Sequence, residues 1–304
     1  MKREFEVVSD SSCDLPKELV EEKEVKVVPF YVTFDGERFY KEGVEIDMPE
    51  FYERMVENPK VIPKSSMPTL QDYVDVFTPL AKEGTPVICI CISSKFSGSV
   101  DCARSAKGMV LEEYPGAVIE VIDAQINTVL QGNYVLEACK LLDAGKGVQE
   151  SVRILEEIRS TGRIFFTVGN LDYLKANGRI GKLSFLAGSV LGLRPLITLK
   201  DGEVYPSGVG RSRKSTLAKS LELTLNYIQE VKATPEEYVM NLGYGYEYEE
   251  AVNYRTQIIA ALAENGFRIT EQDLPLFRVG CAISVHTGPY AMGITILKRA
   301  IPVR

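Results

Sequence analysis

Continuous apolar runs, each followed by a polar turn and an amphipathic stretch, dominate the first half of the chain. The run Val87–Ile92 is rich in β-branched residues and is typical of a strand buried on both faces. Similar runs alternate with stretches of helical spacing, and the predicted strands and helices are 5–9, 15–23, 25–32, 47–56, 70–82, 100–114, 117–122, 134–144 and 148–159. This alternation predicts a parallel sheet with helices on both faces.

The pattern changes after Gly162. Short apolar runs predict strands at 163–168, 196–199, 203–209, 237–242, 267–270, 277–285 and 291–298. Longer stretches predict helices at 171–178, 183–191, 215–231 and 248–265. This order predicts an α+β domain with a mixed or antiparallel sheet. We therefore expect an α/β protein of two domains, residues 1–161 and 162–304.

Two strand-to-helix junctions are rich in hydroxyl side chains. Asp10–Asp14 follows the first strand, and Ser93–Ser99 follows the apolar run described above. Ligands of open parallel sheets bind beyond the carboxyl ends of the strands, and the free N–H groups at a helix start favour an anion there. The alternative is that Ser97 or Ser99 only caps the next helix, as we expect Asp14 to cap the helix at 15–23.

Composition narrows the class of protein. The 304 residues carry a formal net charge of −7, which argues against a general nucleic-acid binder. No apolar stretch approaches the roughly 18 residues that span a membrane, and the first residues lack the apolar core of a signal peptide. The six cysteines form no C-x-x-C pair, which favours buried thiols in a reducing cytoplasm. With a single histidine, His286, we expect no metal site.

Polar clusters in predicted loops, including the loop 59–68, are the candidates for chemistry. They are Ser65-Ser66, Ser97-Gly98-Ser99 and His286-Thr287-Gly288-Pro289. Ser97 and His286 can be read as the nucleophile and base of a serine hydrolase, oriented by Asp10 or Asp123, although no G-x-S-x-G elbow is present. The same hydroxyls and imidazole can instead bind a small anion, such as a sugar phosphate, without reacting with it. The absence of a P-loop or a G-x-G-x-x-G motif disfavours a nucleotide enzyme.

Basic residues gather in predicted loops of the second domain. They are Arg179, Arg211, Arg213 and Lys214. In an acidic protein such a group suits the docking of a negatively charged partner. The alternative is solvated surface charge at helix ends.

Five motifs, in register over residues 5 to about 298, resemble the DegV family. They are Val8-Ser9-Asp10-Ser11-Ser12-Cys13-Asp14-Leu15-Pro16, Lys64-Ser65-Ser66-Met67-Pro68-Thr69, Ser93-Ser94-Lys95-Phe96-Ser97-Gly98-Ser99, Leu174-Lys175-Ala176-Asn177-Gly178-Arg179-Ile180 and His286-Thr287-Gly288-Pro289. The resemblance implies a two-domain α/β protein that binds one long-chain, palmitate-like fatty acid between its domains. It also implies a binding subunit without catalytic residues or cofactors, which presents the fatty-acid carboxylate to a separate ATP-dependent fatty acid kinase that makes the acyl phosphate.

The resemblance assigns roles to five residues. Ser65, Ser97 and His286 would hydrogen-bond the fatty-acid carboxylate. Arg179 and Arg211 match basic positions that are tied to productive interaction with the kinase.

Three positions depart from the family pattern. Ser65 stands where threonine is usual, Met67 stands where glutamine is usual, and Ala124 stands where serine often follows the motif aspartate. Ser65 keeps a hydroxyl, and the other two residues are not among the expected donors to the carboxylate. We therefore expect the head-group site to be retained.

Overall fold

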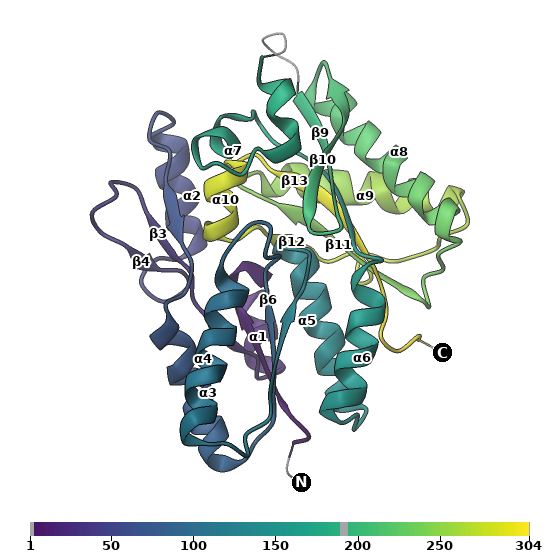
Figure 1. The fold of residues 1–304 in the computed structure, drawn as a ribbon. Helices are drawn as coiled ribbons and strands as arrows, with labels where there is room; N and C mark the ends of the chain where they lie inside the picture. Colours follow the sequence, from purple (N-terminus) through teal and green to yellow (C-terminus); the bar gives the residue numbers. More distant parts are fainter. Residues whose placement is uncertain (1–2, 189–193, 304) are drawn as a thin grey trace.

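The computed structural model describes residues 3–188 and 194–303 (Figure 1). Within these residues, one sheet has four parallel strands in the order β2-β1-β6-β7. They are β1 (Glu6–Asp10), β2 (Lys26–Val28), β6 (Val87–Cys91) and β7 (Ile119–Asp123). One face is covered by α3 (Leu70–Glu83) and α4 (Ser99–Glu113), and the other by α5 (Thr128–Asp143) and α6 (Val148–Arg159). The predicted parallel sheet is confirmed.

A mixed sheet forms the second half of the described chain. Its six strands lie in the order β10-β9-β8-β13-β11-β12 and are antiparallel except for the pair β11-β12. They are β8 (Arg163–Thr167), β9 (Arg194–Lys200), β10 (Glu203–Gly210), β11 (Tyr238–Tyr244), β12 (Leu276–Arg278) and β13 (Met292–Lys298). Helices α8 (Arg213–Val231) and α9 (Tyr248–Glu264) cover one face. The predicted mixed sheet is confirmed.

Helix α5 lies between the two sheets and is buried almost all round (Figure 1). It begins at Thr128, earlier than the predicted start at Tyr134. Its first turns contain Gly132 and Asn133, which weaken isolated helices, so their helical character was not visible in the sequence. Gly132 is required here because a Cβ at this position would lie 2.5 Å from the carbonyl oxygen of Cys13.

A small antiparallel sheet lies beside the four-stranded sheet (Figure 1). It consists of β3 (Tyr31–Thr33), β4 (Tyr40–Lys41) and β5 (Lys64–Ser66). The single strand predicted at 25–32 is divided between β2 and β3, because Pro29 has no N–H group for a continuous ladder. Strand β5 occupies part of the predicted loop 59–68. Helix α2 (Met48–Glu57) begins as predicted, with Asp47 accepting a hydrogen bond from the Glu50 N–H group.

Two predicted strands near the C-terminus are wrong. The segment 277–285 contains only the end of β12, and helix α10 (Cys281–Thr287) follows. Residues 281–285 are all buried, and periodicity alone does not separate a short buried helix from a buried strand. The segment 267–270 forms no strand.

Three helix predictions also need correction. Asp14 does not cap α1 (Lys17–Glu22); it ends the short 3-10 helix η1 (Ser11–Cys13) in a left-handed conformation, and Pro16 precedes α1. Helix α7 (Asp172–Ala176) is shorter than predicted. The predicted helix 183–191 is a 3-10 helix, η2 (Gly181–Gly188), as far as residue 188; the remainder lies outside the described residues.

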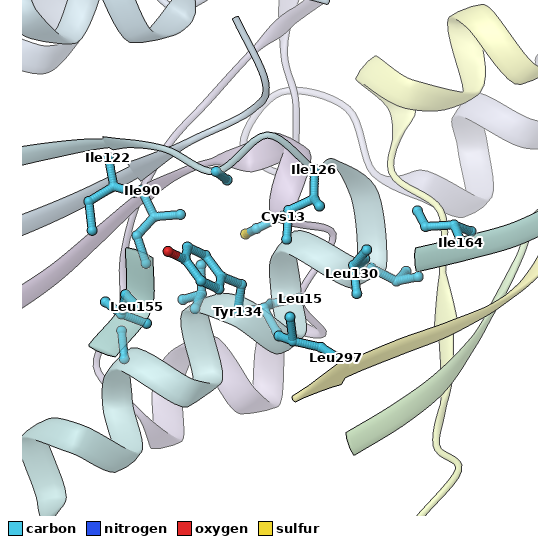
Figure 2. Close-up of a cluster of buried hydrophobic side chains, with 14 of the residues drawn as sticks. Cys13, Leu15, Ile90, Ile122, Ile126, Leu130, Tyr134, Leu155, Ile164 and Leu297 are labelled. Atoms are coloured by element: carbon cyan, nitrogen blue, oxygen red, sulfur yellow. The ribbon is translucent and has the colours of Figure 1, made fainter. Parts of the chain in front are cut away.

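The largest hydrophobic cluster joins the two halves. Ile90 and Ile122 of the four-stranded sheet and Tyr134 of α5 belong to the same cluster as Ile164 and Leu297 of the mixed sheet (Figure 2). The two sheets therefore share a core through α5. A domain boundary at residue 161 stays a prediction.

Candidate functional site

An apolar cavity lies between the two sheets. Its volume is about 310 Å³, at the lower end of the range typical of small-molecule sites. The segment that follows β6, the start of α5 and strands β8, β9, β11 and β13 all contribute to its wall. Most of the lining is apolar, including Phe30, Phe96, Ile164, Phe166, Leu199 and Val279. The cavity therefore suits a ligand with a large apolar part.

Polar side chains also line the apolar cavity, and two of them line a second, more open cavity as well. Ser65, Ser97, Arg179 and His286 all line the first cavity. Ser97 and Arg179 also line the second, which we call the outer cavity. The lining of the apolar cavity thus includes hydroxyl, imidazole and guanidinium groups.

Ser65 and His286 come from distant parts of the sequence and meet in the wall of the apolar cavity. Ser65 lies in β5, His286 lies near the end of α10, and Ser65 Oγ is 3.2 Å from His286 Nε2. Asn177 holds the two segments together, because its side-chain amide donates to the carbonyl oxygens of Pro63 and Val285, at 3.2 Å and 2.9 Å. Sequence reasoning did not assign this role to Asn177, although the residue lies inside one of the five motifs.

The imidazole of His286 is neutral near pH 7. Burial, together with the nearby positive charge of Arg179, lowers its pKa from 6.5 to about 4. Its Nδ1 atom is buried and has no hydrogen-bond partner among the described residues. A neutral imidazole carries one N–H donor, so His286 can donate one hydrogen bond to an anion at the Nε2 side if that nitrogen holds the proton.

Ser97 lies in the turn between β6 and α4. Its Oγ accepts a hydrogen bond from the backbone N–H of Ser99 at 3.2 Å, which leaves its own proton free to donate into the cavity. The alternative reading of Ser97 or Ser99 as the N-cap residue is wrong. Neither residue holds the N-cap position of α4, which is occupied by Gly98, although Ser97 Oγ accepts from the first N–H group of the helix.

The hydrolase arrangement is not formed. The hydroxyl beside the imidazole belongs to Ser65 and not to Ser97. Asp10 accepts hydrogen bonds from four other groups, and Asp123 accepts from Ser94 and Gln125, so neither carboxylate is directed at His286. The nucleophile–base–orienter set proposed from the sequence therefore has no counterpart in the structure.

The four basic residues are in different situations. Arg179 donates to the carbonyl oxygens of Phe96 and Asn177 while it lines both cavities. Arg211 and Lys214 are exposed. Arg213 pairs with Glu250 at 2.8 Å and also donates to a backbone carbonyl, which gives it a structural role. Of the two positions matched to a kinase contact, Arg179 lies at the cavity and Arg211 at the surface.

The described residues contain neither a metal-ligand cluster nor a membrane-spanning helix. No group of three or more His, Cys, Asp or Glu side chains there is placed to hold a metal ion. None of the helices in these ranges has the length and apolar character needed to cross a membrane. The sulfur atoms of Cys89 and Cys91 lie 3.7 Å apart on the same face of β6.

Solved structures with this fold bind fatty acids. A fatty-acid (stearic acid)-binding protein from Eubacterium ventriosum is 38% identical, with a TM-score of 0.91, and the match covers 97% of this chain and 99% of that one. A fatty-acid-binding DegV family protein from Thermus thermophilus is 28% identical, with a TM-score of 0.85, and the match covers 97% and 99% of the two chains. DegV of Bacillus subtilis, a fatty acid binding protein, is 26% identical, with a TM-score of 0.83 and coverage of 98% and 100%.

Sequence comparison agrees with the structural comparison. A DegV domain-containing protein of Clostridium perfringens is 30% identical over 294 residues, which are 97% of this chain and 99% of that protein. One from Deinococcus radiodurans is 32% identical over 290 residues, 95% and 97% of the two chains. The family profile described as "Uncharacterised protein, DegV family" matches residues 4–299. The chain therefore belongs to the DegV family.

Proposed function

We propose that this protein binds one long-chain fatty acid in the apolar cavity, with the carboxylate at Ser65, Ser97 and His286. The observation that carries the proposal is an apolar cavity whose lining also includes Ser65, Ser97 and His286, with Ser65 and His286 in contact. Fatty-acid binding by relatives with the same fold, one of them 38% identical, supports it.

The apolar chain would supply the affinity. Burying about 15 methylene groups at roughly 0.8 kcal/mol each contributes on the order of 10 kcal/mol. This gain is large enough to offset ordering costs of several kcal/mol, provided that the head group keeps its hydrogen bonds. A sugar phosphate would bury polar hydroxyls against apolar side chains such as Phe166 and Leu199, which disfavours that alternative.

The polar side chains in the cavity lining, Ser65, Ser97 and His286, would hold the carboxylate. A carboxylate removed from water is costly unless several donors reach it. Ser97 has a free O–H, and the hydrogen-bonded pair of Ser65 and neutral His286 offers a further donor. The positive charge of Arg179 lies close to His286. Ser65 is in contact with the His286 imidazole, but His286 Nδ1 has no orienting partner among the described residues, so this pair lacks the third member of a catalytic triad. The role we propose is therefore binding without catalysis and without a cofactor.

A second protein would carry out the chemistry. We propose that the bound carboxylate is presented to a separate ATP-dependent fatty acid kinase in the cytoplasm, which forms the acyl phosphate. The position of Arg179 on both cavities and the exposure of Arg211 support contact with such a partner near the head group. This step accounts for a carboxylate site that borders an open cavity.

The binding proposal is tested with the purified protein. We expect mass spectrometry of the denatured protein to detect a released fatty acid of long chain length. We also expect the delipidated protein to bind palmitate at least about tenfold more tightly than hexadecanol, which has the same chain without a carboxylate. Absence of any released fatty acid together with no binding of added palmitate would refute the proposal.

A further inference from the structure

Asp10, the last residue of β1, is a fully buried carboxylate with four hydrogen-bond donors. Its Oδ1 accepts from Ser12 Oγ at 2.6 Å and from Gln131 Nε2 at 2.9 Å. Its Oδ2 accepts from the Ile92 N–H group at 3.0 Å and from Ser99 Oγ at 2.7 Å. These donors offset the cost of burying the charge, although burial still raises the pKa of the Asp10 carboxyl.

The two donors to Oδ2 are the two ends of one turn. Ile92 follows β6 directly, and Ser99 is the first residue of α4. A single carboxylate oxygen therefore closes the segment 92–99, which contains Ser97. The hydroxyl of Tyr73, 2.6 Å from Ser99 Oγ, donates to it because the Ser99 proton is directed at Asp10.

The hydrogen bonds of this turn continue from Ser99 to Ser97, which lines the cavity. The Ser99 N–H donates to Ser97 Oγ, so the residue held by Asp10 also fixes the lone pair of Ser97 and leaves its proton free. On the other flank of β6, Asp123 at the end of β7 accepts from both the hydroxyl and the N–H of Ser94. Carboxylates at the ends of both neighbouring strands thus hold the turn, and Asp10 is the buried one.

We propose that Asp10 is a positioning residue for the head-group site, which acts through Ser99 to direct the Ser97 hydroxyl at the ligand carboxylate. The proposal rests on the proposed function, since it assigns Ser97 to the fatty-acid head group. Asp10 itself does not touch the ligand. It replaces the orienting role toward His286 that the sequence suggested for this residue.

Ser12 and Ser99 provide a matched pair of variants. Both side chains are fully buried, and both hydroxyls donate to Asp10, but only Ser99 lies in the turn. The readout is the ratio of the dissociation constants of hexadecanol and palmitate. A general loss of stability or of cavity shape changes both constants and leaves this ratio unchanged.

We expect Ser99→Ala to lower the ratio about fivefold, as loss of good geometry at one charge-assisted hydrogen bond would do. Ser12→Ala should leave the ratio within about twofold of wild type. Asp10→Asn should retain most of the preference, because its amide oxygen can still accept from Ile92 and Ser99 while Gln131 rotates its amide toward the new NH₂ group. An unchanged ratio in Ser99→Ala, or an equal decrease in Ser12→Ala, would overturn the proposal.

A measurement without ligand separates this inference from the proposed function. The amides of Phe96 and Ser97 donate to the Ser93 carbonyl oxygen, at 2.9 Å and 3.3 Å, so their hydrogen exchange reports whether the turn is held. Exchange at both amides should be at least about fivefold faster in Ser99→Ala and unchanged in Ser12→Ala. If wild type shows no preference for palmitate over hexadecanol, the proposed function fails. The exchange comparison then decides by itself whether Asp10 holds the turn through Ser99. Equal exchange rates in the two variants would refute that role of Asp10.

Discussion

The junctions after β1 and after β6 are both rich in hydroxyl side chains, but these side chains have different environments. In the first, Ser12, Asp10 and Asp14 are buried and hydrogen-bonded to other parts of the protein, including Gln131 and Thr128 of α5. In the second, Ser97 lines the cavity and keeps a free proton. Both are rich in hydroxyl groups and follow parallel strands, so composition and position in the fold do not distinguish them.

The neighbouring elements account for the difference. Helix α5 lies over the first junction, and Gly132 lets it approach the carbonyl oxygen of Cys13. The second junction borders the apolar cavity, and Ser97 forms part of the lining. A hydroxyl-rich turn is therefore a structural support where a helix packs on it, and it keeps hydroxyl groups available to a ligand where a cavity adjoins it. The first junction also serves the second, through Asp10.

Asp10→Ala should have the largest effect and should act on stability. It leaves four donors without their acceptor, and two of these, the Ile92 N–H and the Ser99 hydroxyl, belong to the turn 92–99. Each unsatisfied buried group costs about 1–3 kcal/mol, so we expect the free energy of unfolding to fall by at least about 3 kcal/mol. Urea denaturation measures this change. A loss below about 1 kcal/mol would mean that the first junction is not the support described here.

Ser97→Ala should have a smaller effect, on binding and not on stability. A hydrogen bond to a charged group contributes about 1.5–3 kcal/mol, so we expect the affinity for palmitate to fall at least about tenfold. Urea unfolding should change by less than about 1 kcal/mol, because the alanine leaves only the Ser99 N–H at the helix start unpaired. Ser65→Ala should behave in the same way. A stability loss equal to that of Asp10→Ala would remove the contrast between the two junctions.

The pH dependence of stability should reveal the neutral His286. Because its pKa is about 4 in the folded protein and 6.5 when exposed, only the unfolded chain binds a proton between these values. The stabilising contribution of the neutral imidazole is thus complete above pH 6.5 and is lost as the pH falls toward 4, with a slope of at most about 1.4 kcal/mol per pH unit. His286→Asn should show a shallower decrease in urea unfolding free energy over this range. Identical slopes in the two proteins would contradict the assignment.

Arg211→Ala should have the smallest effect on the isolated protein. The side chain is exposed, so we expect unchanged stability and an affinity for palmitate within about twofold of wild type. With a fatty acid kinase and ATP, however, acyl phosphate formation should decrease. Arg213→Ala is the control for removal of an arginine that has a structural role. Loss of its pair with Glu250 should lower stability by about 1 kcal/mol. Normal acyl phosphate formation by Arg211→Ala would exclude a role in docking.

Regular elements were predictable where the pattern is local. The helix predicted at 70–82 is α3, which begins at the capping box of Thr69 and Asp72, and the strands predicted at 196–199 and 203–209 form the antiparallel pair β9-β10. Segments whose form depends on tertiary contacts were not: α10 has a short apolar sequence that fits a strand equally well, and the start of α5 is poor in helix-forming residues. Tertiary burial decides both cases.

The candidate site was predictable as a set of residues and not as an arrangement. Ser65, Ser97 and His286 all line one cavity. The contact between Ser65 and His286, separated by 221 positions, and the clamp formed by Asn177 depend on how the small sheet and α10 meet. No local pattern encodes that meeting. For the same reason the sequence paired His286 with Ser97 as a catalytic set, which the structure does not form.

A crystal structure of the protein with palmitate tests the central claim most directly. We predict that the acyl chain fills the apolar cavity and that its carboxylate lies within hydrogen-bonding distance of Ser97 Oγ and of Ser65 Oγ or His286 Nε2. The claim is contradicted if palmitate binds outside this cavity, or inside it with the carboxylate away from these three side chains.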